Sequence, residues 1–149
     1  MAPRSTNSPW RQKRDPLWRG DSIAGLADVD PAADRSIVRH VLYLDGAGRA
    51  TPYHSTTEEH AVAGRFAGSA GRVYQTTVSQ AAENGVAHIP RLELIRLLKG
   101  NGQGDARWPN AFEVMQARKY VELWGEHLLN YSGIDSATDA NAVAKRTLK

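Results

Sequence analysis

The sequence predicts a single α+β domain in which amphipathic helices and short strands follow one another along the chain. Its 149 residues are enough for one hydrophobic core and too few for two comfortable domains. Hydrophobic residues make up 41% and charged residues 23%, which is ordinary for a globular protein. Some segments repeat apolar residues at helical spacing, and other short segments are rich in β-branched residues, as strands are. We therefore expect one folded body over residues 16–134.

The two ends of the chain differ from this body in composition. Residues 1–15 are rich in Pro, Ser and Arg without a hydrophobic period, which predicts a flexible leader. Residues 135–149 are expected to form a polar tail. Both ends carry basic residues, which either contact nucleic acid phosphates or are simply solvated. These residues are Arg4, Arg11, Lys13 and Arg14 at one end and Lys145, Arg146 and Lys149 at the other.

The first half of the body is predicted to contain two helices among three strands. The expected elements are a strand over residues 17–19, a helix after residue 30, extended chain over 50–56, a helix over 58–66 and a strand over 72–78. Pro31 suits the first position of a helix, and apolar residues from Ile37 to Leu44 follow at near-helical spacing. Thr57 is placed to cap the second helix. Gly71 ends that helix before the β-branched strand.

The second half is predicted to begin with a short strand over residues 86–89. Pro90 then opens a helix that closes at Gly100. The polar, glycine-containing stretch over residues 101–110 is expected to be a loop.

The run from Val114 to Leu128 has two interpretations. Its apolar residues lie at helical spacing, and Asn110 with Glu113 would form a capping box at the start of such a helix. The competing interpretation is a pair of strands over residues 112–116 and 120–124. The sequence leaves both open.

Composition also excludes several kinds of chemistry. The chain has no cysteine, so disulfides, thiolate metal sites and a cysteine nucleophile are excluded. The five histidines lack the spacings typical of zinc sites, and we expect no metal. No apolar run approaches the ~20 residues that cross a membrane, and no apolar segment follows the basic N-terminus as in a signal peptide. If the protein leaves its cell, another system exports it.

Three short motifs are candidates for function. Arg19 lies in the segment Leu17-Trp18-Arg19-Gly20-Asp21-Ser22 on the first predicted strand. Ser55-Thr56-Thr57 ends a second predicted strand. Glu113 follows later, after a helix and a loop. Each alone has a plain structural explanation: a surface ion pair for the arginine, a helix cap for the Ser-Thr-Thr segment, and a solvated first-turn carboxylate for the glutamate.

Taken in order, these motifs resemble the Arg–Ser–Glu class of mono-ADP-ribosyltransferases, the cholera-toxin-like and pierisin-like toxins. The resemblance covers residues 17–125. The segment from Trp18 to Ser22 is similar to the aromatic-Arg-x-Asp-Ser opening of that class, and Tyr53 before Ser55 is similar to its aromatic-x-Ser-Thr pattern. The resemblance implies a split β-sandwich with flanking helices, and NAD as the substrate.

The same resemblance implies roles for individual residues. The catalytic residues would be Arg19, Ser55 and Glu113, and the residues that bind NAD would be Arg19, Gly20, Thr56 and Thr57. Splitting NAD leaves an oxocarbenium-like ribose that a carboxylate stabilises, while an arginine pairs with the pyrophosphate and a hydroxyl orients the carboxylate. The other candidates for the carboxylate are Glu83, Glu93 and Glu122.

Two features depart from the family pattern. Members that modify protein side chains carry Glu or Gln two residues before the catalytic glutamate, where this chain has Ala111. The family also places its glutamate at a boundary between loop and strand, whereas Glu113 is expected at the start of a helix. In the family, the residue at the position of Ala111 helps to recruit the acceptor. Because this chain lacks that Glu or Gln, the acceptor is expected to be either a nucleic acid or a protein.

The resulting prediction is an NAD-dependent ADP-ribosyltransferase toxin, the active tip of a polymorphic bacterial effector used in interbacterial competition. A secretion system would deliver it into the cytoplasm of the target cell, and a cognate immunity protein would be a partner. The nearest alternative is an NAD glycohydrolase that uses water as the acceptor in the same site. Another is a basic nucleic-acid-binding or nuclease module, and a third is a protein-binding module without catalysis.

Overall fold

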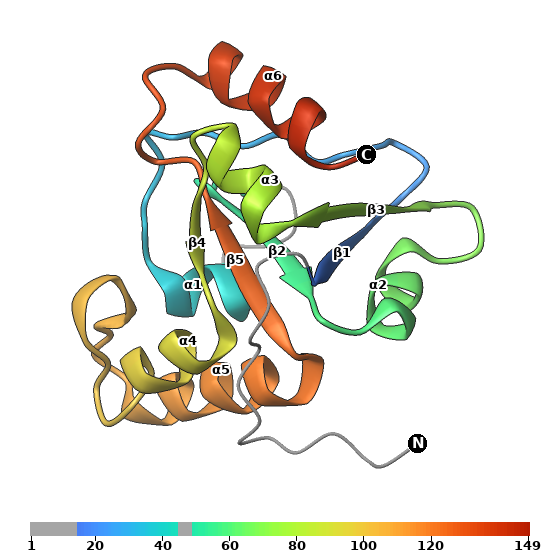
Figure 1. Cartoon of the computed structure of the whole chain (residues 1–149). Coiled ribbons are helices and arrows are strands. Elements are labelled where there is room, and N and C mark those ends of the chain that lie inside the picture. The colour runs from blue at the N-terminus through green and yellow to red at the C-terminus, as the bar shows by residue number, and fades with distance from the viewer. Residues whose placement is uncertain (1–14, 45–48) are drawn as a thin grey trace.

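A computed structural model describes residues 15–44 and 49–149, which form a single α+β domain (Figure 1). The predicted leader lies outside the described residues except for its last residue, Asp15. The described part contains one five-stranded sheet, with strands β1 Pro16–Asp21, β2 Tyr53–Thr57, β3 Arg72–Thr77, β4 Ala87–Ile89 and β5 Glu126–Asn130. The prediction of one α+β domain is therefore confirmed.

The sheet has the strand order β3-β1-β2-β5-β4, and all neighbouring strands are antiparallel. β1 pairs with β3 along its whole length, and β2 does the same with β5. Between these two groups, β1 and β2 are in register only at Trp18 and Thr57. β3 runs in a clearly different direction from β4 and β5 (Figure 1). The sheet therefore opens between β1 and β2.

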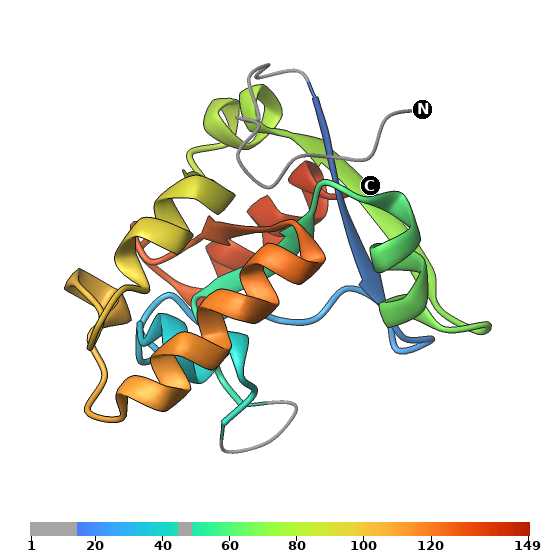
Figure 2. The same cartoon turned by 90° about the horizontal axis from the view of Figure 1, so that it is seen from below.

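Helices cover both faces of this sheet. They are α1 Ile37–Val41, α2 His60–Ala67, α3 Val78–Glu83, α4 Arg91–Leu97, α5 Ala111–Trp124 and α6 Ala137–Thr147, with a short 3-10 helix over Gly104–Ala106. Seen from below, α5 crosses under the sheet beside α4 and α1, while α2 lies at the other end against β1 and β3 (Figure 2). α6 lies on the opposite side of the sheet (Figure 1). None of the helices in the described part of the chain is long and apolar enough to cross a membrane.

Two hydrophobic clusters stabilise the domain, one on each face of the sheet. The first packs α1, α4 and α5 against β2 and β5, and it includes Val121 and Leu128. The second packs α3 and α6 on the other face, and it includes Leu129 and Val143. Because successive strand residues point to opposite faces, the neighbours Leu128 and Leu129 contribute to different clusters. β5 is thus fixed from both sides.

The predicted polar tail is corrected by the structure, because residues 137–147 form α6. The buried residues of this helix are Ala140, Val143, Ala144 and Thr147, which lie three or four positions apart. The last residue, Lys149, also exchanges two backbone hydrogen bonds with Gln75 in β3. The folded body therefore extends beyond residue 134 to the end of the chain.

The long run after residue 110 is helical, so the alternative of two strands is wrong. α5 begins where the Asn110 side chain accepts hydrogen bonds from the backbone N–H groups of Phe112 and Glu113. It ends at Trp124, because Gly125 adopts the left-handed conformation (φ 58°) and closes the helix. The predicted helix to Leu128 was thus too long, and its last part is strand β5.

The helix predicted to start at Pro31 begins later. Asp30 instead closes a turn, where its carboxylate accepts a hydrogen bond from the Ala32 N–H at 3.0 Å. α1 starts after Ser36, whose hydroxyl accepts a hydrogen bond from the Arg39 N–H at 3.2 Å. The other predicted helices and strands agree with the structure within a few residues.

Candidate functional site

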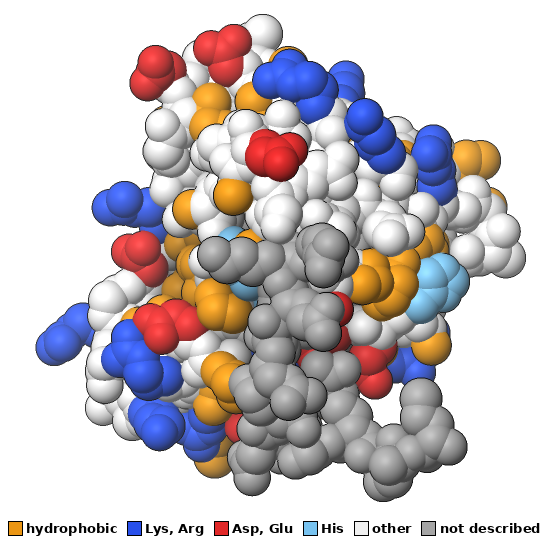
Figure 3. All heavy atoms as spheres, in the orientation of Figure 1, with side chains coloured by type: hydrophobic (Ala, Val, Ile, Leu, Met, Phe, Trp, Pro, Cys, Tyr) orange, Lys and Arg blue, Asp and Glu red, His pale blue; other side chains and the backbone are white. Residues whose placement is uncertain are grey.

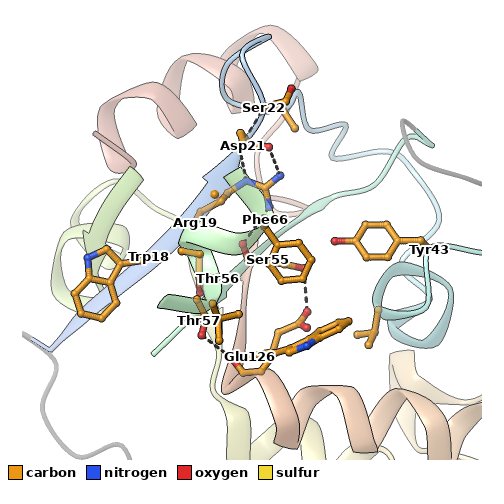
Figure 4. A pocket seen from close by; sticks show the side chains of 16 residues that line it. Trp18, Arg19, Asp21, Ser22, Tyr43, Ser55, Thr56, Thr57, Phe66 and Glu126 are labelled. Atoms are coloured by element: carbon orange, nitrogen blue, oxygen red, sulfur yellow. Dashed lines mark hydrogen bonds and ion pairs between the residues drawn. The ribbon is translucent and has the colours of Figure 1, made fainter. Parts of the chain in front are cut away.

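The opening between β1 and β2 leads into a cavity of about 380 Å³ (Figure 4). Its walls come from β1, β2 and α2, together with the end of α5 and the first residue of β5. The residues predicted as site residues that line it are Arg19, Gly20, Ser55, Thr56 and Thr57. The Arg19 motif and the Ser55-Thr56-Thr57 motif therefore meet in one site.

The carboxylate in this site belongs to Glu126 and not to Glu113. Glu126 is the first residue of β5 and pairs with Thr57 across the strands. The Ser55 hydroxyl donates a hydrogen bond to Glu126 Oε2 at 2.9 Å (Figure 4). Glu126 is only 4% exposed, and burial raises the pKa of its carboxyl to about 7, although the Ser55 hydrogen bond and the charge of Arg19 lower it. A buried carboxyl at a cavity wall with such a pKa is typical of a functional site.

Glu113 lies in the first turn of α5 and does not line the cavity. Its carboxylate accepts a hydrogen bond from the Trp108 indole N–H at 2.9 Å, which ties the preceding loop to the helix. The structure therefore does not bring Glu113 together with Arg19 and Ser55. The reason is the capping interaction at Asn110, which begins α5 here and directs Glu113 to the helix start.

The other three glutamates proposed from the sequence also lie outside this cavity. Glu83 ends α3, and Glu122 is exposed on α5. Glu93 pairs with Arg96 one turn along α4. Glu126 was missed because Trp124 and Leu128 continue the helical spacing of α5 across it. The signal that could have found it is Gly125, a residue that commonly ends helices.

A histidine that the sequence did not single out completes the hydrogen bonding of Ser55. Burial, with the charges of Arg19 and Arg49, lowers the pKa of His40 to about 3, so its ring is neutral near pH 7. His40 Nε2 lies 2.8 Å from the Ser55 hydroxyl oxygen, and Nδ1 lies 2.8 Å from the Thr51 hydroxyl oxygen.

The direction of these hydrogen bonds follows from the number of hydrogens available. Ser55 has one hydroxyl hydrogen and gives it to Glu126, so it must accept from His40 Nε2–H. His40 Nδ1 then accepts from the Thr51 hydroxyl, which itself accepts from the Tyr53 N–H at 3.2 Å. This series of hydrogen bonds, from Thr51 through His40 and Ser55 to Glu126, thus fixes the orientation of the Glu126 carboxylate. With its hydrogen directed at a carboxylate, Ser55 is suited to orient Glu126 rather than to act as a nucleophile.

Arg19 is held beside this series of hydrogen bonds by its neighbours. Its Nε and Nη2 donate to the two carboxylate oxygens of Asp21 at 2.7 and 3.0 Å, and Nη1 donates to the Ser55 carbonyl at 3.0 Å. A guanidinium has five N–H donors, so two remain without a partner among the described residues. Arg19 is therefore preorganised to donate two hydrogen bonds to an anionic ligand.

Gly20, Thr56 and Thr57 have structural roles other than those predicted, and the N-cap of α2 is Glu59 and not Thr57. A Cβ at Gly20 would lie 1.9 Å from the Ala63 carbonyl oxygen, so only glycine lets α2 pack this closely on β1. The Thr56 hydroxyl donates to the His127 carbonyl at 3.0 Å, and the Thr57 hydroxyl donates to the Trp124 carbonyl at 2.5 Å. These bonds fix the turn that carries Glu126, and any contact with a ligand would come in addition.

The rest of the cavity wall is mostly apolar. Phe66 lies edge-on to Trp124, with ring centroids 5.3 Å apart, and Tyr120 stacks on Trp124. Phe66 is 47% exposed, so it presents its ring to the cavity rather than to the core. A flat apolar group that enters beside Glu126 would meet these rings.

A second cavity, of about 470 Å³, adjoins the first. Four residues line both cavities: Arg19, Ala27, Tyr43 and Ser55. The second cavity is also lined by the polar side chains of Asp28, Asp30, Arg39, His40 and Arg49. The first cavity thus contains the aromatic rings of Phe66 and Trp124, the second has more charged residues, and Arg19 lines both. Within the described ranges, no group of side chains has a composition and geometry that could hold a metal ion.

Comparison of the chain with protein-family models, curated protein sequences and solved structures found no significant match. The function must therefore be inferred from the geometry of the site and the short motifs that form it.

Proposed function

We propose that this protein is an NAD-dependent mono-ADP-ribosyltransferase, in which Arg19, Ser55 and Glu126 form the catalytic centre. The observation that carries the proposal is the hydrogen bond from Ser55 to the buried Glu126 carboxyl, in a cavity that both residues share with Arg19. Glu126 follows Gly125 at the start of a strand, which is where the Arg–Ser–Glu class places its glutamate. The sheet that opens between β1 and β2 is also compatible with a split β-sandwich of that type.

The chemistry of the site suits the cleavage of NAD. The bond between ribose C1′ and the nicotinamide ring nitrogen breaks, and its electron pair leaves with neutral nicotinamide. The ribose becomes oxocarbenium-like, and the ionised Glu126 carboxylate stabilises this positive charge and accepts a hydrogen bond from a ribose hydroxyl. The acceptor nucleophile then bonds to C1′ and releases its proton to solvent.

The remaining residues of the two cavities would bind the rest of the substrate. The two available N–H donors of Arg19 would pair with oxygens of the pyrophosphate. Nicotinamide would lie against the rings of Phe66 and Trp124, close to Glu126. The ADP half would then extend into the second cavity, which has more charged residues.

A nucleic acid remains as good an acceptor as a protein. Two residues before Glu126 the chain has Trp124, and not the Glu or Gln of family members that modify protein side chains. Lys and Arg side chains gather over α6 and the C-terminal end of the chain (Figure 3), where Lys145 and Arg146 occupy the last turn of the helix. Such cations would attract the phosphates of a nucleic acid.

An NAD glycohydrolase is the second candidate, because the same cavity would serve it with water as the nucleophile. A toxin delivered into a target cell, with a cognate immunity protein, is the biological role that we propose for either activity. The nucleic-acid-binding, nuclease and protein-binding alternatives need no NAD.

The test is incubation of the protein with NAD labelled in its adenosine half, alone and with separated protein, single-stranded DNA, double-stranded DNA and RNA. Nicotinamide release together with label on a macromolecule would support the transferase. Nicotinamide release with free ADP-ribose as the only labelled product would support the glycohydrolase. No nicotinamide release under any condition would refute both.

A further inference from the structure

Tyr43 has an unusual backbone conformation. With φ at 54°, it is the only residue other than glycine with a positive φ in the part of the chain that the structure describes. It follows Leu42, the C-cap residue of α1. The Leu44 N–H donates a hydrogen bond to the Arg39 carbonyl at 3.0 Å, which closes the turn that contains Tyr43. Glycine is the usual residue at this position of a helix-ending turn, because a side chain is strained there. A tyrosine here therefore has a cost to the fold.

The fold gains little from the tyrosine side chain in return. Tyr43 is 52% exposed and belongs to neither hydrophobic cluster. Its hydroxyl makes no hydrogen bond with any described residue. A strained residue that packs against little is better explained by a ligand than by stability.

The position of the ring indicates what that ligand is. Tyr43 is one of the four residues that line both cavities, with Arg19, Ala27 and Ser55. In Figure 4 the hydroxyl end of Tyr43 points toward the ring of Phe66, above Glu126 in this view. A dinucleotide that occupied both cavities would have to pass the ring of Tyr43.

We infer that Tyr43 is a substrate-binding residue, whose ring contacts the dinucleotide where it crosses from one cavity to the other. This inference rests on the proposed function, since it takes NAD as the ligand. The ring would help to hold the nicotinamide half of the substrate against Phe66, while Arg19 binds the pyrophosphate from the opposite side of the dinucleotide. Since Tyr43 makes no bond to Glu126, its contribution is to binding rather than to the chemical step.

Replacement by glycine separates the two roles of this residue. Tyr43→Gly relieves the backbone strain and removes the ring, so we expect a higher midpoint of urea unfolding together with weaker binding of NAD. Stacking on an aromatic ring typically changes affinity by about tenfold or more, and we expect the Kd and KM for NAD to rise by roughly tenfold with a smaller change in kcat. Tyr43→Asn is a second variant, because asparagine also tolerates this conformation. Phe112→Ala is the matched control, since Phe112 is an exposed aromatic residue outside both cavities.

The Kd for NAD is measured by calorimetry, and unfolding by urea titration, for the four proteins. Weaker binding in Tyr43→Gly and Tyr43→Asn, with normal binding in Phe112→Ala, would support the inference. Wild-type affinity in both Tyr43 variants would overturn it and leave the proposed function in place. If the wild-type protein neither binds nor cleaves NAD, the proposed function and this inference both fail.

Discussion

Replacement of Glu126 by glutamine should raise the free energy of unfolding at alkaline pH. The gain over the wild type should be much smaller at acidic pH. Burial raises the pKa of Glu126 from its ordinary value of 4.5 to about 7. Between these two values the folded protein holds a proton that the unfolded chain has released. The free energy of unfolding therefore falls as pH rises through this window, and the full cost of the buried charge is present above pH 7. Glutamine has no charge to bury at any pH.

The size of the effect follows from the two pKa values. One pH unit corresponds to 1.36 kcal/mol, so the window from 4.5 to about 7 contains roughly 3 kcal/mol in total. Between pH 5 and pH 8.5, the difference in unfolding free energy between Glu126→Gln and wild type should grow by about 2.5 kcal/mol. Glu126 is only 4% exposed, so solvent screening does not reduce this figure much. In urea, this corresponds to a shift of the midpoint by roughly 1–2 M.

The assay is urea unfolding followed by far-UV circular dichroism at pH 5, 6, 7, 8 and 8.5. His40, whose pKa is lowered to about 3 by burial, destabilises the folded protein as pH falls, but this effect is common to both proteins and cancels in the difference. Glu113→Gln is the matched control, because it is the same replacement outside the cavity, and the growth of the stability difference with pH should be larger in Glu126→Gln than in this control. A difference between Glu126→Gln and wild type that stays constant from pH 5 to 8.5 would refute the assignment of a raised pKa to Glu126.

Two further variants test residues that hold the site in place, one at Ser55 beside Glu126 and one at Gly20 beneath α2. Ser55→Ala removes the hydrogen bond that lowers the pKa of Glu126. In the wild type we expect kcat/KM for NAD to rise with pH around pH 7, and in Ser55→Ala this rise should move to higher pH. An unchanged midpoint of the rise would show that Ser55 does not act on this carboxyl. Gly20→Ala should destabilise the fold by about 3 kcal/mol or more in urea unfolding, because its Cβ would lie 1.9 Å from the Ala63 carbonyl oxygen. Gly64→Ala, in the same helix as Ala63 and with open space around it, is the control and should be neutral or stabilising.

The fold class and most elements could be predicted because local signals agree with the final structure. The helical spacing from Val114 to Val121 and the cap at Asn110 are both local, and of the two interpretations that the sequence leaves open the structure has the helix, α5. The sequence predicts Arg19 and Ser55 on separate strands, and these two residues meet because β1 and β2 are neighbours in the sheet.

The rest depended on contacts between distant parts of the chain. α6 looks polar in the sequence because it buries mostly small residues such as Ala140 and Ala144, and its position is fixed by contacts with β3 and β5. His40 belongs to no recognisable motif, and only the packing of α1 brings it to Ser55. Glu126 was hidden because apolar spacing alone continues past Gly125, although the chain there changes from helix to strand.

The most direct test of the central claim is nicotinamide release from NAD by the wild type, Glu126→Gln and Glu113→Gln, measured at pH 8 with saturating NAD. Removal of a preorganised electrostatic group typically lowers the rate by ~10²–10³. If Glu126 is the carboxylate that stabilises the ribose, Glu126→Gln should lose this much of the rate while it still binds NAD, and Glu113→Gln should keep the wild-type rate. Full activity in Glu126→Gln, or an equal loss in Glu113→Gln, would contradict the assignment of the catalytic centre to Arg19, Ser55 and Glu126.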